Sequence, residues 1–264
     1  MTNDFLVEIG CEELPPKALI TLVTAFAKGI EDGLSKVALG FNKISTFATP
    51  RRLAVKIEGL EQAQKDKQVL RKGPSIKAAF DKDGNASKAA LGFAKSCGVD
   101  VDKLETIKEV KGEWLAFNLQ EKGQATTELL EVIVNSSIKK LPIPKPMRWG
   151  NSKVQFVRPV HWLLMMFGSE VVPAKVLGLN SSNKTFGHRF HHANSIALEH
   201  VDDYQKSLQQ AYVIADFHER KAIIKKQILN CAQKCQAKLV EDESLLDEVT
   251  AIVEWPQAVL VDFD

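Results

Sequence analysis

The sequence lacks the glycine spacings that phosphate-binding loops require. No two of its fifteen glycines are separated by a single residue, and no glycine is followed by lysine. These absences exclude the dinucleotide-binding pattern GxGxxG and the phosphate-binding loop with its Gly-Lys pair. His218-Glu219 begins like a zinc-protease helix, but Ala222 stands where the second histidine is needed. Since the GxSxG nucleophile turn is also missing, we predict no catalytic residue and no bound cofactor in this chain.

Long apolar runs and patterned cysteines are also missing. The longest apolar run, Trp162–Phe167, has six residues, whereas a helix needs about 20 to cross a bilayer. The N-terminus has no basic region followed by an apolar one, which argues against a secretory signal. The four cysteines form no disulfide framework, and the histidines of GHRFHH, 187–192, lack further ligands at metal-site spacing. We therefore expect a cytoplasmic protein without membrane contact or a metal site.

The net charge of +2 hides an uneven distribution. Residues 139–192 contain nine Lys and Arg against one acid, Glu170, and therefore carry +8. Residues 194–264 contain thirteen acids against seven bases. A concentrated positive segment suits a polyanion such as RNA, although a solvated basic surface without a ligand explains the same composition.

Hydrophobic spacing and turn residues predict an α+β fold. Helical spacing runs from Pro16 to Leu39, and Glu12 and Glu13 fit the positive end of this helix. Asp216, with an acid three residues later, predicts the start of a helix to Lys238. Other helices are expected at 75–80, 87–97, 127–141 and from 245, and strands at 5–10, 44–47, 53–57, 106–110, 114–119, 154–167, 171–177 and 253–264. Because these elements do not alternate as βα units, we predict mixed antiparallel sheets with packed helices.

A proline-rich connector divides the chain. LPIPKPMRWG, residues 141–150, has three prolines in five positions, which keep the segment extended and out of a helix. We expect one α+β region at 1–140 and a second at 151–264, with the alternative that the two form one continuous domain. No cap or polar tail follows the strand expected at 253–264, so we expect the second region to be truncated at the C-terminus.

Four short clusters combine cations with aromatic or turn residues and are candidates for RNA contact. A guanidinium such as those of TPRRLA can bind phosphate through two parallel hydrogen bonds. The prolines of the connector reduce the entropy lost when its cations and tryptophan bind a base or, more commonly for tryptophan, another domain. The strand FVRPVHW and the loop FGHRF could line a groove for RNA or a small molecule, although ion pairs and packing explain such residues equally well. The candidates are Arg51, Arg52, Lys145, Arg148, Trp149, Arg158, His161, His188 and Arg189.

Several longer segments carry a family resemblance. FLVEIGCEELPPKAL at 5–19, TPRRLA at 49–54, LPIPKPMRWG at 141–150, FVRPVHW at 156–162, GHRF at 187–190 and IVEWP at 252–256 appear in this order. Together they closely resemble the N-terminal part of the β subunit of the two-subunit bacterial glycyl-tRNA synthetase. The resemblance covers nearly the whole chain, and the two longest segments are too specific to match by chance.

This resemblance implies an α2β2 enzyme that joins glycine to its tRNA with ATP. It implies that ATP and Mg²⁺ are used by the α subunit, and that the partners of this chain are that α subunit and tRNA(Gly), with no DNA. It also implies tRNA contact and subunit scaffolding for this region, which is similar to the B3/B4 module of the β subunit of phenylalanyl-tRNA synthetase. Two alternatives stay open: a hydrolase that edits aminoacyl-tRNA, and a protein–protein interaction module without RNA contact.

Overall fold

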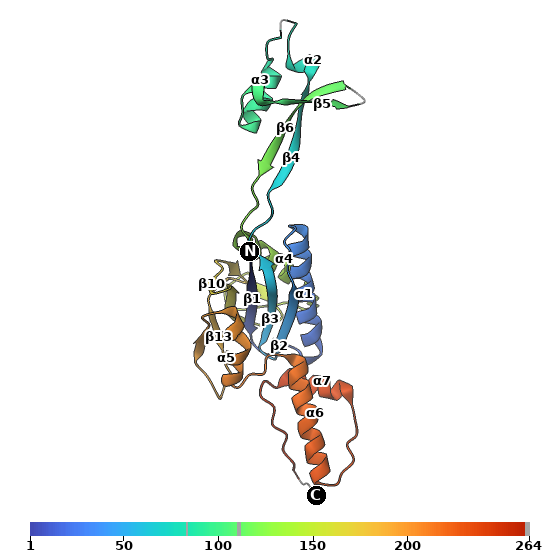
Figure 1. Ribbon diagram of the computed structural model, residues 1–264. Helices are drawn as coiled ribbons and strands as arrows, with labels where there is room; N and C mark the ends of the chain where they lie inside the picture. The colour runs from blue at the N-terminus through green and yellow to red at the C-terminus, as the bar shows by residue number, and fades with distance from the viewer. Residues whose placement is uncertain (83, 110–111, 262–264) are drawn as a thin grey trace. The chain divides into compact units, whose positions relative to one another are not determined.

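A computed structural model describes residues 1–82, 84–109 and 112–261, so Lys111 of the expected hairpin and residues 262–264 of the expected last strand lie outside it. The chain forms two compact units (Figure 1). Unit 1 combines Met1–Ala63 with Ala125–Asp264, and unit 2 is Gln64–Gln124. Within the described ranges, no helix is both long enough and apolar enough to span a bilayer.

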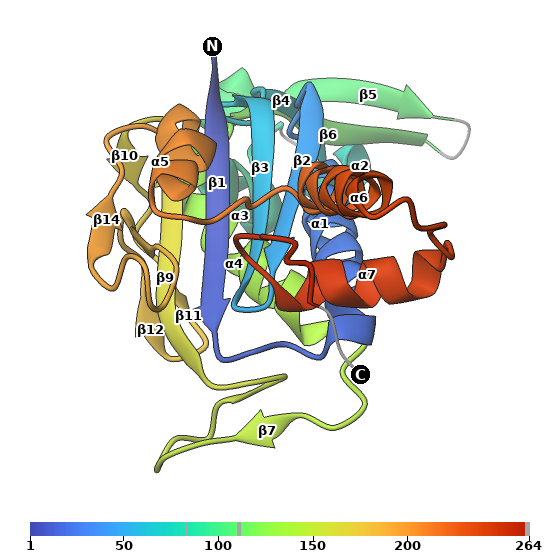
Figure 2. The same cartoon turned by 90° about the horizontal axis from the view of Figure 1, so that it is seen from below.

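Unit 1 is built on a five-stranded antiparallel sheet with β1 at its centre. Figure 2 shows β9, β1, β3 and β2 side by side in this order. Leu6 of β1 lies opposite Met166 of β9 on one side and Lys56 of β3 on the other. A strand from the second half of the chain thus completes the sheet that the first residues begin. The strands are β10 (Glu170–Val171), β9 (Val160–Phe167), β1 (Thr2–Cys11), β3 (Arg52–Glu61) and β2 (Lys43–Thr49).

Two helices cover one face of this sheet. Alternate residues of β1, Phe5, Val7 and Ile9, pack in the same core as α1 (Leu19–Lys36) and α4 (Thr126–Lys139). The two helices approach closely because α1 carries glycines where they meet: a Cβ on Gly33 would lie 2.6 Å from Ile133 Cγ2. A 3-10 turn, Pro16–Ala18, leads into α1, and proline suits this first turn because it needs no backbone N–H there.

The opposite face is buried by elements from residues 184–210. Leu6 points to this side and packs with Leu164, Met166, Tyr204 and Leu208 in a second core. Because both faces are covered, β1 is buried continuously from Phe5 to Cys11 and β9 from Trp162 to Phe167, and most of these residues are apolar. The covering elements are β13 (Lys184–Phe186), β14 (Ser195–Ala197), the 3-10 turn Val201–Asp203 and α5 (Tyr204–Gln210), and the remaining short strands of unit 1 are β7 (Met147–Arg148), β8 (Gln155–Phe156), β11 (Lys175–Val176) and β12 (Leu179–Asn180).

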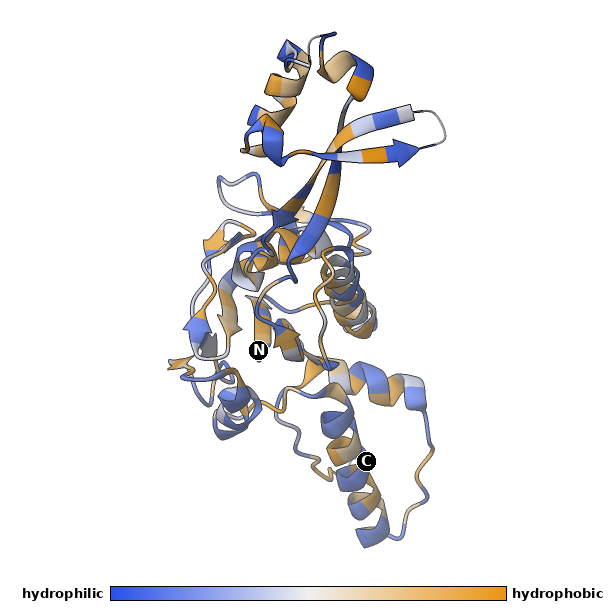
Figure 3. Ribbon diagram, turned by 45° about the horizontal axis from the view of Figure 1, so that its top comes forward, coloured by the Kyte–Doolittle hydropathy of each residue, from blue (hydrophilic) through white to orange (hydrophobic). Residues whose placement is uncertain are grey.

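Two helices near the C-terminus, α6 (Phe217–Lys234) and α7 (Glu243–Ile252), are tied to the sheet by a buried arginine. Arg220 donates from Nη2 to the carbonyl of Ala48 at 2.8 Å and from Nε to the carbonyl of Thr250 at 3.1 Å. Asp216 caps α6, since its Oδ1 accepts hydrogen bonds from the amides of the first two residues beyond Phe217. Figure 3 shows hydrophilic residues along α6 interrupted by hydrophobic ones.

Unit 2 is inserted between β3 and α4. Its three-stranded antiparallel sheet has the order β4 (Lys67–Ser75), β6 (Gly112–Glu121), β5 (Glu105–Glu109). Two helices, α2 (Ile76–Ala79) and α3 (Lys88–Cys97), and the 3-10 turn Val101–Lys103 complete it. The core cluster of its described residues consists of Ala79, Ala90 and Leu115, with partly buried side chains around them. Unit 2 therefore has a much smaller core than unit 1.

The predicted α+β class with mixed antiparallel sheets and packed helices is confirmed. The long helices expected from Pro16, residue 127, Asp216 and residue 245 are present, as are the strands expected at 5–10, 44–47 and 53–57. Three local predictions are wrong. Residues 253–261 form no strand, residues 171–177 hold only two short strands, and β4 occupies a segment for which no strand was predicted.

The two compact units do not divide at the proline-rich connector. Residues 1–140 and 151–264 were expected as regions, with the alternative of one continuous domain, but the boundaries of the units fall at 63/64 and 124/125. The physical reason is the pairing of β1 with β9, which joins both sides of the connector in one sheet. A bridge between Ala63 and Ala125 joins the two segments of unit 1 where the insertion begins and ends in the sequence.

Candidate nucleic-acid interface

Three predicted residues of unit 1 meet at the end of β1, where Glu12 follows the strand. The Nε2 of His161 lies 2.8 Å from Glu12 Oε1, and Nη1 of Arg189 lies 3.7 Å from Glu12 Oε2. Arg158 also belongs to this end, because its Nε donates to the carbonyl of Glu13 at 3.0 Å. The carboxylate of Glu12 thus contacts an imidazole from a strand and a guanidinium from a distant loop. Sequence reasoning did not select Glu12, which it assigned to the start of a helix.

The neighbouring arginines of TPRRLA point to different environments. Arg52 is fully buried, where its guanidinium reaches Glu8 Oε2 at 3.4 Å and Glu254 Oε1 at 3.3 Å. Arg51 is half-buried, with its guanidinium carbon 5.8 Å from the ring centroid of Trp162. Of these two arginines, Arg51 alone therefore has exposed surface for contact with RNA. Arg52 cannot contact RNA, because it is buried and its N–H groups donate to buried acceptors.

Glu8 is the centre of the buried cluster beneath this surface. It accepts hydrogen bonds from Trp162 Nε1 at 2.5 Å, Thr185 Oγ1 at 2.6 Å and the Tyr204 hydroxyl at 2.5 Å. Burial, together with the Glu8 carboxylate, raises the pKa of Tyr204, so the phenol stays protonated and donates. These three donors, together with the Arg52 guanidinium, satisfy the buried carboxyl group of Glu8.

Gly10 allows the indole of Trp162 to lie against β1. A Cβ at this position would come within 1.8 Å of Trp162 Cε2. The indole therefore occupies the space of a missing side chain, between the Glu8 carboxylate below and the Arg51 guanidinium at its face. Burial raises the pKa of the adjacent Cys11 to about 12, so this cysteine stays a thiol and is a poor nucleophile.

The loop carrying His188 and Arg189 is held by a local turn. The Nδ1 of His188 accepts hydrogen bonds from the amides of Phe190 and His191, both at 3.3 Å. Burial, with the positive charges of Arg51 and Arg52 nearby, lowers the pKa of His188. The neutral imidazole therefore dominates at neutral pH, as an accepting Nδ1 requires.

Exposed aromatic rings continue from this loop. The ring centroids of His188 and Phe190 are 6.1 Å apart, those of His188 and His191 4.5 Å, those of His191 and Tyr212 5.3 Å, and those of Tyr212 and Trp255 5.5 Å. We call these five rings the aromatic row. Sequence reasoning selected only His188 among them, although Phe190 and Trp255 stand in the quoted segments GHRF and IVEWP.

A cavity of about 220 Å³ lies where the aromatic row meets the cations. Its lining includes Arg51, His188, Arg189, Phe190 and Trp255, together with Glu13. Guanidinium groups bind phosphate, and exposed rings stack on bases, so the lining fits a nucleotide strand. Among the residues that the structure describes, no group of three His, Cys, Asp or Glu side chains is arranged to hold a metal ion.

The remaining predicted residues lie in the proline-rich connector. Lys145 and Arg148 are exposed, and Arg148 belongs to β7, which pairs with β8. Trp149 is half-buried and packs against the main core of unit 1, which corresponds to the anchoring role rather than to a free stacking platform. Figure 2 shows β7 on an arm that projects beyond the sheet. No described hydrogen bond or ion pair joins this arm to Glu12.

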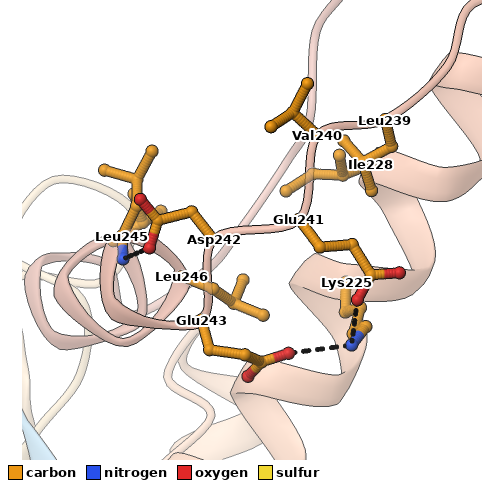
Figure 4. A pocket seen from close by; sticks show the side chains of 10 residues that line it. Lys225, Ile228, Leu239, Val240, Glu241, Asp242, Glu243, Leu245 and Leu246 are labelled. Carbon is orange, nitrogen blue, oxygen red and sulfur yellow. Dashed lines mark hydrogen bonds and ion pairs between the residues drawn. The ribbon is translucent and has the colours of Figure 1, made fainter.

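A second cavity, of about 260 Å³, lies between α6 and α7 (Figure 4). Apolar side chains such as Ile228, Leu239 and Leu246 line it, and Lys225 bonds to Glu243 at its rim at 2.9 Å. None of the candidate RNA-contact residues lines this cavity. Its apolar lining suits hydrophobic side chains rather than a phosphate strand.

Comparison with known proteins places these features in a family. A family model described as "Glycyl-tRNA synthetase beta subunit" matches residues 5–264. The chain is 51% identical over 263 residues to the glycine–tRNA ligase beta subunit of Chromohalobacter salexigens, and the match covers 100% of this chain and 38% of the relative. The corresponding subunits of Alteromonas mediterranea and Hahella chejuensis are 49% and 48% identical over 263 residues, covering 100% and 99% of this chain. The chain spans 38% of the length of each of these relatives.

Proposed function

The chain belongs to the glycyl-tRNA synthetase beta subunit family, and on this basis we propose that it is part of the β subunit of an α2β2 enzyme that attaches glycine to tRNA(Gly). We assign tRNA contact and subunit scaffolding to this region, and the use of ATP and Mg²⁺ to the α subunit. The four cysteines are free thiols, which supports a reducing compartment, and we place the protein in the cytoplasm.

The observation that carries the tRNA proposal is the cationic and aromatic surface at the end of β1. Arg51 and Arg189 line one cavity together with exposed rings. These residues, with the +8 segment at 139–192, offer positive charge to a polyanion. Arg148 and Lys145 on the projecting arm are a second, separate candidate for phosphate contact.

The same surface favours binding over bond formation. Adenylate formation needs a preorganised phosphate site, and the glycine patterns that build such loops are missing from the sequence. Cys11, which borders the surface, is buried as a thiol, and the Glu12 carboxylate faces His161 and Arg189 rather than a nucleophile. The arrangement supports holding and orienting the tRNA while the α subunit carries out the chemistry.

The test is the salt dependence of tRNA(Gly) binding by the intact β subunit. Log affinity should fall linearly with log salt concentration, because bound counterions are released from the RNA. The double variant Arg148→Ala/Arg189→Ala should weaken binding and reduce the salt slope by about 2, since each phosphate contact contributes about 1. The matched control Lys36→Ala/Lys226→Ala removes two exposed lysines of α1 and α6 and should change neither quantity.

Other outcomes would contradict the proposal. Binding that is independent of salt and of these arginines would favour a protein–protein module. Release of amino acid from mischarged tRNA by the β subunit alone would favour an editing hydrolase. ATP–pyrophosphate exchange without the α subunit would contradict the assignment of adenylate chemistry.

A further inference from the structure

Five rings from three distant parts of the chain form the aromatic row on the surface of unit 1. Phe190 is 84% exposed, Tyr212 43% and Trp255 39%. Large aromatic side chains usually contribute to the core, and exposing several of them together marks a binding surface. The loop containing His188 is fixed by its own turn, so these rings are displayed on an ordered backbone.

Cations stand beside the aromatic row. Arg51 and Arg189 line the same cavity as Phe190 and Trp255. Arg51 makes no ion pair among the described residues, and Arg189 is 3.7 Å from Glu12, which is a long contact for an ion pair. Both guanidinium groups can therefore bind a phosphate without first breaking a strong ion pair. The carboxylates nearby are engaged, since Glu254 binds Arg52 and Glu12 binds His161, so Glu13 is the one exposed acid in the described lining.

We propose that the aromatic row stacks unpaired bases of an RNA strand whose phosphates lie on Arg51 and Arg189. This inference rests on the proposed tRNA-binding function and specifies which part of an RNA the surface takes. The bases of a duplex are stacked on one another and leave no free face, whereas unpaired bases offer theirs. Stacking on protein rings accepts any base, because every base has a π face.

The charge of His188 agrees with this role. Its Nδ1 is occupied as an acceptor, so the neutral ring displays Nε2–H and a flat face beside Phe190 and His191. A neutral ring stacks on bases without drawing the phosphate out of position. The strand would then meet rings with its bases and guanidinium groups with its backbone, as in single-strand binding surfaces generally.

The experiment compares two RNA probes on the intact β subunit. One is a labelled, unstructured ten-nucleotide RNA, and the other is a blunt RNA hairpin with a stem of ten base pairs closed by a non-nucleotide linker. Phe190→Ala and Trp255→Ala should each weaken binding of the single strand about tenfold, within the range of about 5- to 150-fold expected for one stacked base, and should leave the duplex unchanged. The control Val132→Ala removes a 70% exposed apolar side chain from α4 and should change neither affinity.

Two further variants separate stacking from other contacts. Phe190→Leu keeps an apolar side chain but removes the π face. This variant should therefore bind the single strand as weakly as Phe190→Ala does. Glu13→Gln removes the exposed acid and should raise that affinity a few-fold. Because Phe190 is 84% exposed, its replacement should not unfold the protein, and an unchanged melting temperature would verify this.

The outcomes distinguish this inference from the function on which it rests. If Arg51→Ala/Arg189→Ala weakens tRNA binding while Phe190→Ala and Trp255→Ala do not, the tRNA function stands and the stacking inference is overturned. If Phe190→Leu binds like the unaltered protein, the surface is an apolar contact for a protein segment, and the inference is again overturned. If none of the variants affects tRNA binding, both the stacking inference and the proposed tRNA-binding function are overturned.

Discussion

The buried Arg52 and the half-buried Arg51 next to it provide a sharp test of the structure. We predict that Arg52→Met strongly destabilises unit 1, whereas Arg51→Met does not. Arg52 is 0% exposed and lies within 3.4 Å of the Glu8 carboxylate and within 3.3 Å of the Glu254 carboxylate, which are 0% and 6% exposed. Methionine keeps an unbranched apolar side chain but carries no charge, so the substitution removes both ion pairs together with the hydrogen bonds to Thr49 and the Phe186 carbonyl.

The magnitude follows from the two carboxylates that are left behind. Removing one partner of a buried ion pair costs about 3–5 kcal/mol, because the remaining charge is buried without compensation. Glu8 keeps its three neutral donors, but among the described residues the Glu254 carboxylate keeps one hydrogen bond, from the hydroxyl of Thr49 at 2.6 Å. For a unit of this size, about 1 kcal/mol lowers the melting temperature by about 2–4 °C. The expected decrease is therefore roughly 6–20 °C for Arg52→Met.

Calorimetry of the two single variants is the assay. Arg51→Met should lower the melting temperature by no more than about 4 °C, since a partly exposed cation contributes about 1 kcal/mol or less. It should instead weaken tRNA binding. Adding Glu254→Gln to Arg52→Met should restore part of the loss, because the uncompensated charge is removed. Equal melting temperatures for the two arginine variants would refute the assignment of Arg52 to the interior.

Three further predictions concern the sheet, the loop and the insertion. Gly10→Ala should destabilise unit 1 by several kcal/mol, because its methyl would overlap the indole of Trp162, and urea unfolding would measure this. NMR titration of His188 should give a pKa below its ordinary value of 6.5. Because the pKa is lowered in the folded state, His188 contributes stability that is fully present above pH 6.5 and is lost as the pH falls through the folded pKa. Replacing 64–124 with a short linker should leave the hydrogen-exchange protection of unit 1 intact, since residues 63 and 125 are already bridged, and lost protection would contradict the insertion.

The elements that sequence reasoning found are those with strong periodic patterns. The helices from Leu19 and from Phe217 have long apolar stripes or a clear cap, and these signals are local. β4 was missed because most of its residues are exposed and because Gly73-Pro74 reads as a break. The insertion of unit 2 could not be predicted, because it depends on the return of the chain to unit 1, where Ala63 bridges to Ala125 and α4 packs in the same core as α1.

The structure brings part of the predicted residue set together, while the exposure of each residue and the further rings depend on strand register and tertiary contacts. Arg51, His161, His188 and Arg189 were selected from short clusters, and the structure gathers them at one end of β1. Whether Arg51 or Arg52 faces solvent depends on the strand register, which the turn before them does not reveal. Tyr212 and Trp255 were missed because they join the row only through tertiary contacts.

Trp162 connects the buried cluster around Glu8 with the proposed RNA surface, because it contacts residues of both. The indole N–H of Trp162 donates a hydrogen bond to Glu8, and the face of the ring lies against the Arg51 guanidinium. The ring centroid of Trp162 is 4.9 Å from that of Phe186, the residue at which the chain enters the His188 loop. The Phe186 carbonyl in turn accepts a hydrogen bond from Arg52 at 2.9 Å. Since Arg52 is held by carboxylates from β1 and from the segment after α7, one ionic network fixes both ends of the aromatic row. A buried ionic network is a poor source of net stability but a good means of fixing geometry, which is what a stacking surface for a flexible strand requires.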